Sequence, residues 1–306
     1  MENKRKLLLW KNMTGDPVTD GFSRNPEYHE FFRQCNEVFE FRFAMEKDAY
    51  LGDGVFKNIF KYEKGRIIPA EEEFRPDVVY QFKRMTGDSF DNKVKIINTA
   101  EFRAWCGDKW NQYQLLSEFM PKTFLIESED DYKASLEKIT TNKAVLKTRR
   151  GQKGENVTVF KIETPPPLVP ELLQTKGYLL QEFADTTVGI PDIVSGLHDL
   201  KLITINNRVF ANLRTPDQIE TEICTFDSPY TEVAITSLPP ELLEFHGRVK
   251  AIVEAEYPNQ IYTVDVGMTP NGPTVFELNS HTAFPYIHFE YAQDFFAAFI
   301  DLLKKY

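Results

Sequence analysis

The chain has 306 residues, which is more than one small core usually needs and favours two or three subdomains. It is 42% hydrophobic and 27% charged, as globular proteins are, and its net charge of −10 argues against a dedicated nucleic-acid binder, which needs a basic surface. Because the early apolar run Leu7 to Trp10 is too short for a signal or a membrane span, and the three scattered cysteines make no disulfide pattern, we expect a cytoplasmic protein without nucleic-acid or membrane partners.

The first hundred residues predict an α/β lobe. Residues 5–10, 76–82 and 94–98 are short apolar runs bounded by turn residues, which is typical of buried strands. A polar and aromatic stretch, 26–43, lies between the first two. Strands with intervening helices in one lobe indicate the α/β class.

The rest of the chain predicts further helices and strands. Asp108 can cap a helix whose apolar positions Tyr113, Leu116 and Phe119 recur at helical spacing, and Pro121 ends it. A later helix carries Leu243 and other apolar residues on one side. In chain order, we expect strands at 144–147, 156–160, 178–183, 199–205 and 208–213, a helix at 239–257 with Leu243, Val249 and Val253 on its buried side, a hairpin of 261–268 and 273–279, and a closing helix at 293–305.

The last hairpin is the most informative segment. Asp265 and Glu277 each lie six residues from Asn271, so an antiparallel hairpin places them roughly opposite each other. Asn279 points to the same face because side chains alternate along a strand. Two carboxylates and an amide oxygen form a hard-oxygen site suited to Mg²⁺. The alternative is a solvated outer face of the hairpin.

A second segment can bind an anion. Lys147 ends a predicted strand, and the loop that follows contains Gly151, Lys153 and Gly154. A point charge and flexible backbone N–H groups suit a polyphosphate, although the loop lacks the Walker A spacing. A solvated basic turn is the alternative.

A third segment offers contacts to a nucleotide base and to a carboxylate. The strand through Gln181, Glu182 and Phe183 can present edge backbone groups to adenine, with Glu182 as an added acceptor. Arg214, at the end of another predicted strand, is a fork donor for a carboxylate or a phosphoryl group. Surface ion pairs are the alternative for both charged side chains.

In this order, the segments resemble the ATP-grasp superfamily over about residues 95 to 285. The resemblance rests on Asp108-Lys109, the strand and loop after Val145, the strand 179–183, the pair of strands from Asp199 to Arg214, and the acidic hairpin. It implies an N-terminal α/β lobe (1–100), a central lobe with the phosphate loop (101–182) and a C-terminal lobe with the magnesium site (183–306). The two later lobes are expected to be α+β and to hold ATP between them.

The resemblance also implies roles for single residues. Lys109, Lys147, Gly151, Lys153 and Gly154 would contact phosphates. The adenine site would be formed by Gln181, Glu182 and Phe183, with Asp185 a candidate for the ribose. Arg214 and Lys201 would be the catalytic cations, and two Mg²⁺ ions, for which Mn²⁺ can substitute, would be held by Asp265, Glu277 and Asn279. The chain departs from the family pattern at Thr263, where an arginine is usual.

The function implied by the resemblance is an ATP-dependent carboxylate–amine ligase. Its branch includes glutathione synthetase, D-alanine–D-alanine ligase and glutamate-adding peptide ligases, so the substrates can be amino acids or peptides, and a homodimer is also expected. The carboxylate would be activated as an acyl phosphate, with release of ADP. Two other classes stay open, namely a small-molecule kinase on the same scaffold and a non-catalytic ATP- or peptide-binding module.

Overall fold

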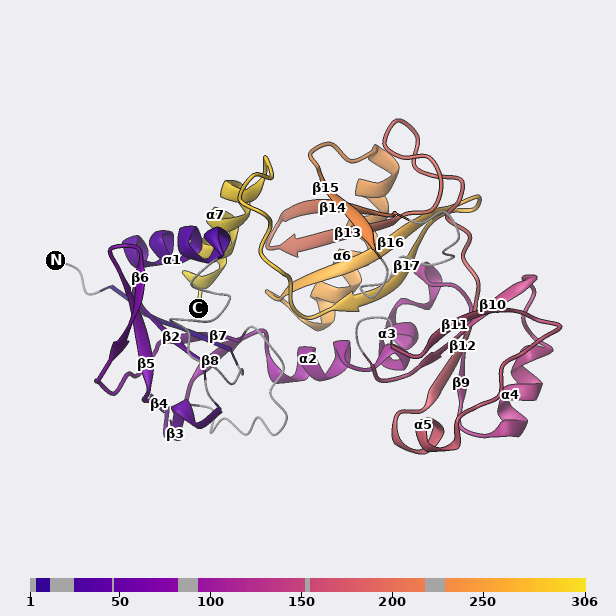
Figure 1. Ribbon diagram of the computed structural model, residues 1–306, viewed down its shortest axis with the longest axis horizontal. Helices are drawn as coiled ribbons and strands as arrows, with labels where there is room; N and C mark the ends of the chain where they lie inside the picture. Colours follow the sequence, from indigo (N-terminus) through magenta and orange to yellow (C-terminus); the bar gives the residue numbers. More distant parts are fainter. Residues whose placement is uncertain (1–3, 12–24, 46, 82–92, 152–154, 218–228) are drawn as a thin grey trace.

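The computed structural model describes residues 4–11, 25–45, 47–81, 93–151, 155–217 and 229–306. Within these ranges the chain forms three larger sheets, of six, four and five strands, and a two-stranded ribbon. The three larger sheets lie along the long axis of the molecule, with the five-stranded sheet between the other two (Figure 1). The fold is mixed α/β, as the sequence predicted.

The N-terminal sheet has the strand order β6-β5-β2-β1-β7-β8. Its centre is parallel, from β2 through β1 and β7 to β8, and β5 and β6 add an antiparallel edge. The three strands predicted in this region are confirmed as β1, β7 and β8. The bounds are β1 Lys6–Trp10, β2 Glu40–Ala44, β5 Ile59–Glu63, β6 Arg66–Ala70, β7 Val78–Gln81 and β8 Lys95–Ile97.

Both faces of this sheet are apolar. One face packs against α1 (Pro26–Val38) and α7 (Ala292–Leu303), and the other packs over Leu8 and Trp10 against the ribbon of β3 (Tyr50–Gly52) and β4 (Val55–Phe56), which follows the short helix η2 (Lys47–Ala49). The predicted closing helix is confirmed as α7. It packs on the N-terminal sheet, although it lies at the C-terminal end of the sequence. Figure 1 shows α7 beside α1.

The four-stranded central sheet has the order β11-β10-β12-β9 and is antiparallel. Helices α4 (Glu129–Leu136) and α5 (Pro170–Thr175) cover one of its faces through Tyr132 and Leu172. The strands predicted on both sides of the glycine loop are confirmed as β10 and β11. The bounds are β9 Thr123–Ile126, β10 Lys143–Thr148, β11 Val157–Lys161 and β12 Tyr178–Glu182.

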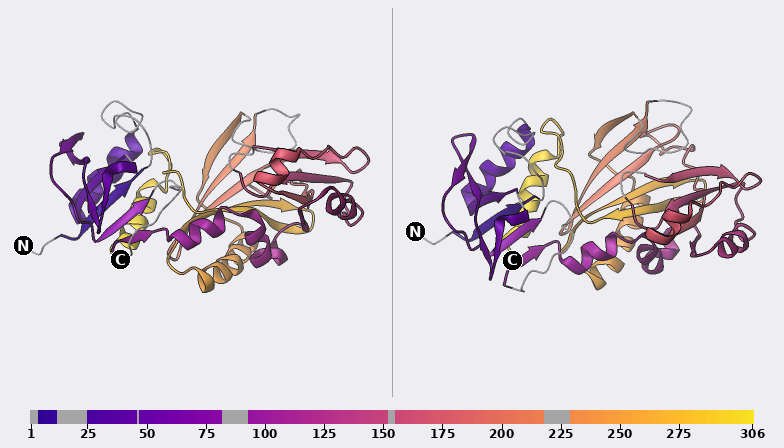
Figure 2. Two further views of the ribbon diagram at one scale, coloured as in Figure 1. Left: turned by 90° about the horizontal axis from the view of Figure 1, so that it is seen from below. Right: turned by 60° about the horizontal axis from the view of Figure 1, so that its bottom comes forward.

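The five-stranded C-terminal sheet has the order β15-β14-β13-β16-β17 and is antiparallel throughout. Leucine and valine side chains on one face pack against α6 (Pro240–Glu256) and against α2 (Ala100–Cys106), α3 (Lys109–Leu116) and η3 (Ser117–Phe119). Figure 2 shows these helices on one side of the sheet. The bounds are β13 Asp199–Ile205, β14 Arg208–Pro216, β15 Tyr230–Ile235, β16 Ile261–Thr269 and β17 Gly272–Asn279.

The predicted buried side of α6 is wrong in one position. Leu243 is 44% exposed, whereas its neighbour Leu242 is fully buried. The residues that face the sheet are Leu242, Phe245, Val249 and Val253, which follow a helical spacing of three to four residues. Leu243 is rotated by one residue, about 100°, away from that row.

Two buried amides fix the last hairpin in place. Gln112 of α3 accepts a hydrogen bond from the Leu278 N–H (2.8 Å) and donates to the Leu278 carbonyl (3.0 Å). Asn98, which follows β8, accepts from the Ile261 N–H (2.7 Å) and donates to the Ile261 carbonyl (2.6 Å). The hairpin is therefore tied both to the helix before the central sheet and to the N-terminal sheet.

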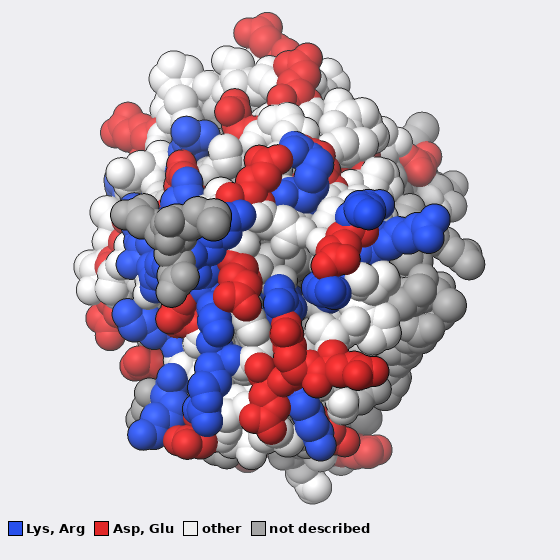
Figure 3. All heavy atoms as spheres, turned by 90° about the vertical axis from the view of Figure 1, so that its left-hand side faces the viewer, with Lys and Arg blue, Asp and Glu red and all other residues white. Residues whose placement is uncertain are grey.

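The surface carries charges of both signs. On the end of the molecule formed by the N-terminal sheet, acidic side chains lie among the basic ones (Figure 3). Among the helices in the described ranges, none combines the length and the apolar character that crossing a membrane requires.

Candidate functional site

The acidic hairpin has the predicted register. Asp265 of β16 lies opposite Glu277 of β17, beside a β-bulge at Asp265/Val266. The amide of Asn279 donates to Asp265 Oδ2 and to Glu277 Oε1, both at 3.2 Å. The three predicted metal ligands therefore converge on one point of the sheet, on the face opposite the one that the helices cover.

Two cations lie beside this hairpin on the neighbouring strands. Lys201 of β13 is opposite Asp265, and its Nζ lies 4.0 Å from Asp265 Oδ1. Arg214 of β14 is opposite Asp199 and forms a close ion pair with it, while its guanidinium lies 3.8 Å from Asp265 Oδ1. Because all four side chains point to the same face, the predicted catalytic cations and the metal ligands form one cluster.

Burial makes these carboxylates costly to ionise. It raises the pKa of Asp265, although Lys201 and Arg214 oppose the effect. Burial, together with the charge of Asp265, raises the pKa of Asp199 to about 7. In the described part of the chain, Asp265 Oδ1 and Asp199 Oδ1 are buried and accept no hydrogen bond. Such oxygens are well suited to a cation that the protein itself does not supply.

The donor set fits Mg²⁺. No group of three or more His, Cys, Asp or Glu side chains with metal-binding spacing occurs in the described residues, so the site depends on two carboxylates and one amide. Oxygen donors that few in number suit Mg²⁺, which keeps waters or phosphates as its other ligands. The Asn279 amide now turns its nitrogen to the carboxylates, and a rotation about its last torsion would turn its oxygen there instead.

The central sheet contributes Lys147, a buried lysine of β10. Its Nζ donates to Gln181 Oε1 (2.8 Å), and Gln181 donates in turn to Thr123 Oγ1 (2.7 Å). Burial lowers the pKa of Lys147 to about 8, and the charge of Lys109 adds to this effect, while Glu277 opposes it. Lys147 is thus held by neutral partners and can charge fully when an anion arrives.

Lys109, at the start of α3, joins the two sheets. Its Nζ donates to the Gly151 carbonyl (2.8 Å) and lies 3.5 Å from Glu277 Oε2. Burial opposes ionisation of Glu277, but Lys109 and Lys147 outweigh it and hold the pKa of this carboxyl below its usual range. The lysines of the predicted phosphate site and the carboxylates of the predicted metal site therefore meet at Glu277.

Asp108 contacts the residues that begin the predicted phosphate loop. Its carboxylate caps α3 at the Trp110 N–H (3.1 Å) and accepts two bonds from Arg149 Nε (2.7 and 2.9 Å). It also accepts from Arg150 Nε (3.3 Å). Sequence reasoning identified only the helix cap, because the pairing with Arg149 joins segments that lie far apart along the chain.

The prediction that 181–183 is an edge strand is wrong. Strand β12 lies between β10 and β9, so the backbone of Gln181 is used within the sheet, and the N–H groups of Glu182 and Phe183 donate to the carbonyls of Lys122 and Lys143. The Glu182 carboxylate accepts from the N–H and the hydroxyl of Thr140. Gln181 instead contacts the site through its side chain, as the partner of Lys147.

The remaining predicted residues are spread around this centre. Gly151 follows β10 at the Lys109 contact, whereas Lys153 and Gly154 lie outside the described residues. Asp185 follows β12, and the side chain of Thr187, together with its backbone N–H (2.9 Å), lowers the pKa of the Asp185 carboxyl by hydrogen bonding. Asp199 was not singled out as a site residue, yet its alternation with Lys201 along β13 already indicated a place on the same face.

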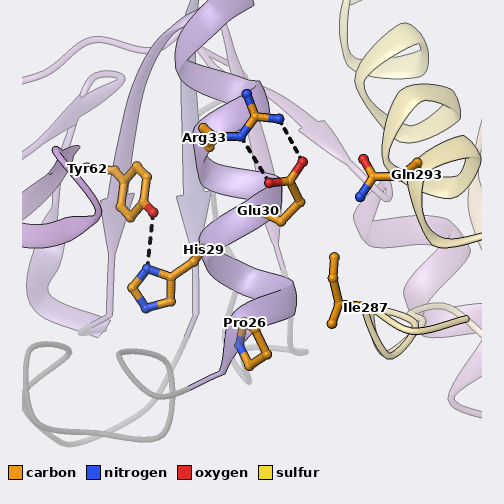
Figure 4. Close-up of a pocket in the computed structure, with 7 residues that line it drawn as sticks. All are labelled: Pro26, His29, Glu30, Arg33, Tyr62, Ile287 and Gln293. Carbon is orange, nitrogen blue, oxygen red and sulfur yellow. Dashed lines mark hydrogen bonds and ion pairs between the residues drawn. The ribbon is translucent and has the colours of Figure 1, made fainter.

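A separate hollow of about 630 Å³ lies on the N-terminal lobe. It is lined by residues of α1, β5, α7 and the segment before α7, and none of them is a predicted site residue. Its polar groups bond to one another, His29 with Tyr62 and Arg33 with Glu30 (Figure 4). This hollow has no part in the cluster at Glu277.

Comparison with known proteins identifies the fold. No protein-family model and no curated protein sequence matches the chain. Solved structures match it over nearly its whole length. D-alanyl-alanine synthetase A from Vibrio cholerae is 11% identical, with a TM-score of 0.64 over 99% of this chain and 98% of that one.

Two ATP-grasp ligases with bound ligands also match. A RiPP-associated ATP-grasp ligase from Chryseobacterium gregarium, in complex with ADP and a leader and core peptide, is 13% identical, with a TM-score of 0.62 over 99% of this chain and 97% of that one. The ATP-grasp ligase PsnB, with Mg, ADP and a variant of its minimal precursor, is 12% identical, with a TM-score of 0.60 over 99% and 100%. The chain has the ATP-grasp fold, as the sequence resemblance implied.

Proposed function

We propose that this ATP-grasp chain is an ATP-dependent ligase that joins a carboxylate to an amine. One observation carries the proposal. The metal-type carboxylates Asp265 and Glu277 lie within 4.0 Å of cations from three separate elements, Lys109, Lys201 and Arg214. Buried charges of both signs at one point fit a site that binds and transfers a phosphoryl group.

The nucleotide phosphates are proposed to bind where Lys109 joins the central and C-terminal sheets. Lys147 and Lys109 would supply positive charge from one side, and Gly151 begins the loop whose Lys153 and Gly154, outside the described residues, the sequence assigns to the phosphates. Asp265, Glu277 and Asn279 would hold Mg²⁺, which neutralises phosphate charge when it is bound. The solved ATP-grasp ligases that bind ADP, one of them with Mg, support this assignment. Glu182, Phe183 and Asp185 are proposed to face the adenosine.

The reaction has two transfers. An oxygen of the substrate carboxylate attacks the γ-phosphorus, the bond to the β-phosphate oxygen breaks, and ADP leaves. The uncharged amine nitrogen then attacks the carbonyl carbon of the acyl phosphate, the bond between that carbon and the phosphate oxygen breaks, and phosphate leaves with the proton that the amine loses. Arg214 and Lys201 stabilise the charge on the transferring group, and no protein nucleophile takes part.

The first experiment measures the binding of ATP by calorimetry with and without Mg²⁺. We expect Mg²⁺ to strengthen binding, Glu277→Gln to remove that effect, and Lys147→Ala to weaken binding at least about tenfold. Lys133→Ala and Glu137→Gln, both exposed on or beside α4, are the matched controls. Unchanged affinity in both site variants would exclude this nucleotide site. Once binding is established, ADP release in a screen of carboxylates and amines tests the ligase reaction, with the amide identified by mass spectrometry.

A further inference from the structure

The face of the C-terminal sheet that carries the metal ligands continues past them to the edge strand β15. Across this face, Glu232 of β15 lies opposite Arg214, which lies opposite Asp199. Glu232 is therefore on the same side of the sheet as Asp265, and Arg214 lies between them. None of the roles assigned above uses Glu232.

Glu232 is held in position by a chain of two hydrogen bonds. The buried Asn212 donates from Nδ2 to Glu232 Oε1 (2.7 Å), and the buried Tyr291 hydroxyl donates closely to Asn212 Oδ1. Burial and the negative charge of Glu232 raise the pKa of Tyr291, so its hydroxyl stays protonated and remains a donor. Glu232 is half-buried, and the two hydrogen bonds of Asn212 and Tyr291 fix the orientation of its carboxylate. The exposed side of this carboxylate can therefore contact a ligand.

Tyrosine side chains lie in the neighbourhood of this carboxylate. The guanidinium of Arg214 lies 5.6 Å from the centre of the Tyr230 ring. Tyr286, on the segment between β17 and α7, is 52% exposed, and its pKa is raised by burial and then by the charges of Glu232 and Tyr230, which places all three side chains in one neighbourhood. A carboxylate among tyrosine rings is a preferred environment for an organic ammonium group.

We propose that Glu232 binds the ammonium group of the amine acceptor. The inference rests on the proposed function. Under that function, the order of side chains across the sheet matches the order of the three reactants. The hairpin of Asp265 and Glu277 holds the nucleotide end, Arg214 holds the carboxyl group that becomes the acyl phosphate, and Glu232 lies on the far side of Arg214. The acceptor is thus a primary amine that enters beside β15.

The test uses L-alaninamide as a cationic probe and N-acetyl-L-alaninamide as its uncharged counterpart. Each is titrated by NMR into the full chain saturated with ADP and Mg²⁺. We expect L-alaninamide to bind and the acetylated probe not to bind. Glu232→Gln should weaken L-alaninamide binding at least tenfold while the affinity for ADP and Mg²⁺ stays within twofold.

Control variants test whether a loss of L-alaninamide binding is specific to Glu232 and to the residues that hold it. Glu244→Gln, an exposed glutamate of α6, should leave the binding of both ligands unchanged. Tyr291→Phe keeps the ring but removes the donor to Asn212, and we expect it to weaken L-alaninamide binding by a smaller factor of two to five. The melting temperature of each variant shows whether it is folded.

The outcomes distinguish the two levels of the proposal. Failure of the wild-type chain to bind ADP and Mg²⁺ overturns the proposed function. Normal nucleotide binding without L-alaninamide binding, or with equal binding to wild type and a folded Glu232→Gln variant, overturns the acceptor site alone. Equal binding of the charged and acetylated probes also overturns it.

Discussion

The N-terminal and C-terminal sheets bury their strands in different ways. Strand β1 has Leu7 and Leu9 on one apolar face and Leu8 and Trp10 on the other, as is usual for parallel strands covered on both sides. Strand β16 is as deeply buried, yet it alternates between Val264 or Val266 on the helix-covered face and Asp265 on the other. Burial alone therefore does not distinguish a strand with a structural role from a strand at the candidate site. The two strands differ in the polarity of the side chains on the face that no helix covers in β16.

The largest effect on ligand affinity should come from the charged face. Asp265→Asn removes a buried carboxylate from the proposed metal ligands, and we expect the Mg²⁺-dependent affinity for ATP to fall at least about 100-fold, or ~2.7 kcal/mol. Calorimetry measures it. The melting temperature should not fall, because burial raises the pKa of Asp265 and so makes its ionised form costly in the folded chain. A strongly destabilised variant would mean that Asp265 is structural.

For the apolar N-terminal sheet we expect the opposite behaviour, a loss of stability without a loss of ligand affinity. Phe299 of α7 is fully buried against Phe31 and Tyr80, so Phe299→Ala should lower the free energy of unfolding by about 3–5 kcal/mol. Urea denaturation measures this loss. The affinity of the folded protein for ATP is expected to stay unchanged, and a loss below about 1 kcal/mol would contradict the packing described for α7.

The buried lysine of the central sheet gives a pH-dependent prediction. Because the pKa of Lys147 is about 8, the free protein loses this charge as pH rises through 8, and phosphate binding should then draw a proton back. At pH 8.5 we expect ATP binding to take up a substantial fraction of a proton. Calorimetry in two buffers of different ionisation enthalpy measures the uptake. Lys147→Arg, which stays charged, should abolish it.

The same group affects stability with a defined sign. Below pH 8, Lys147 is charged in both the folded and the unfolded chain, and the cost of burying its charge is fully present. Between pH 8 and its usual pKa near 10.5 the unfolded chain binds more protons, so this group makes the folded protein more stable as pH rises. A Lys147→Met variant should lack this rise in a series of denaturation curves.

The smallest expected effect is that of Leu243, which is compared with its neighbour Leu242 in α6. Leu242→Ala should lower the free energy of unfolding by about 2–5 kcal/mol, because Leu242 is fully buried. Leu243→Ala, at a position 44% exposed, should change it by less than about 0.5 kcal/mol. Chemical denaturation compares the two variants, and similar losses would contradict the orientation of the helix.

Local pattern was enough to predict much of this molecule. Strand alternation and the position of Asn271 gave the pairing of Asp265 with Glu277, because a short hairpin fixes its own register. The same reasoning could not predict that β12 lies inside its sheet. Its second neighbour is β9, and the residues of β12 alone do not indicate which strand pairs with that side. The partners Gln181 for Lys147 and Arg149 for Asp108 likewise depend on how distant segments fold together.

The packing of α7 on the N-terminal sheet has a consequence for synthesis of the chain. The last of the strands β1, β7 and β8 leaves the ribosome about 200 residues before α7, which must cover one of their apolar faces. At ~5–20 residues per second this interval lasts roughly 10–40 s. During that time a nascent chain exposes Leu7, Leu9 and Tyr80 to other molecules, and the first lobe to be translated is the last that can complete its core.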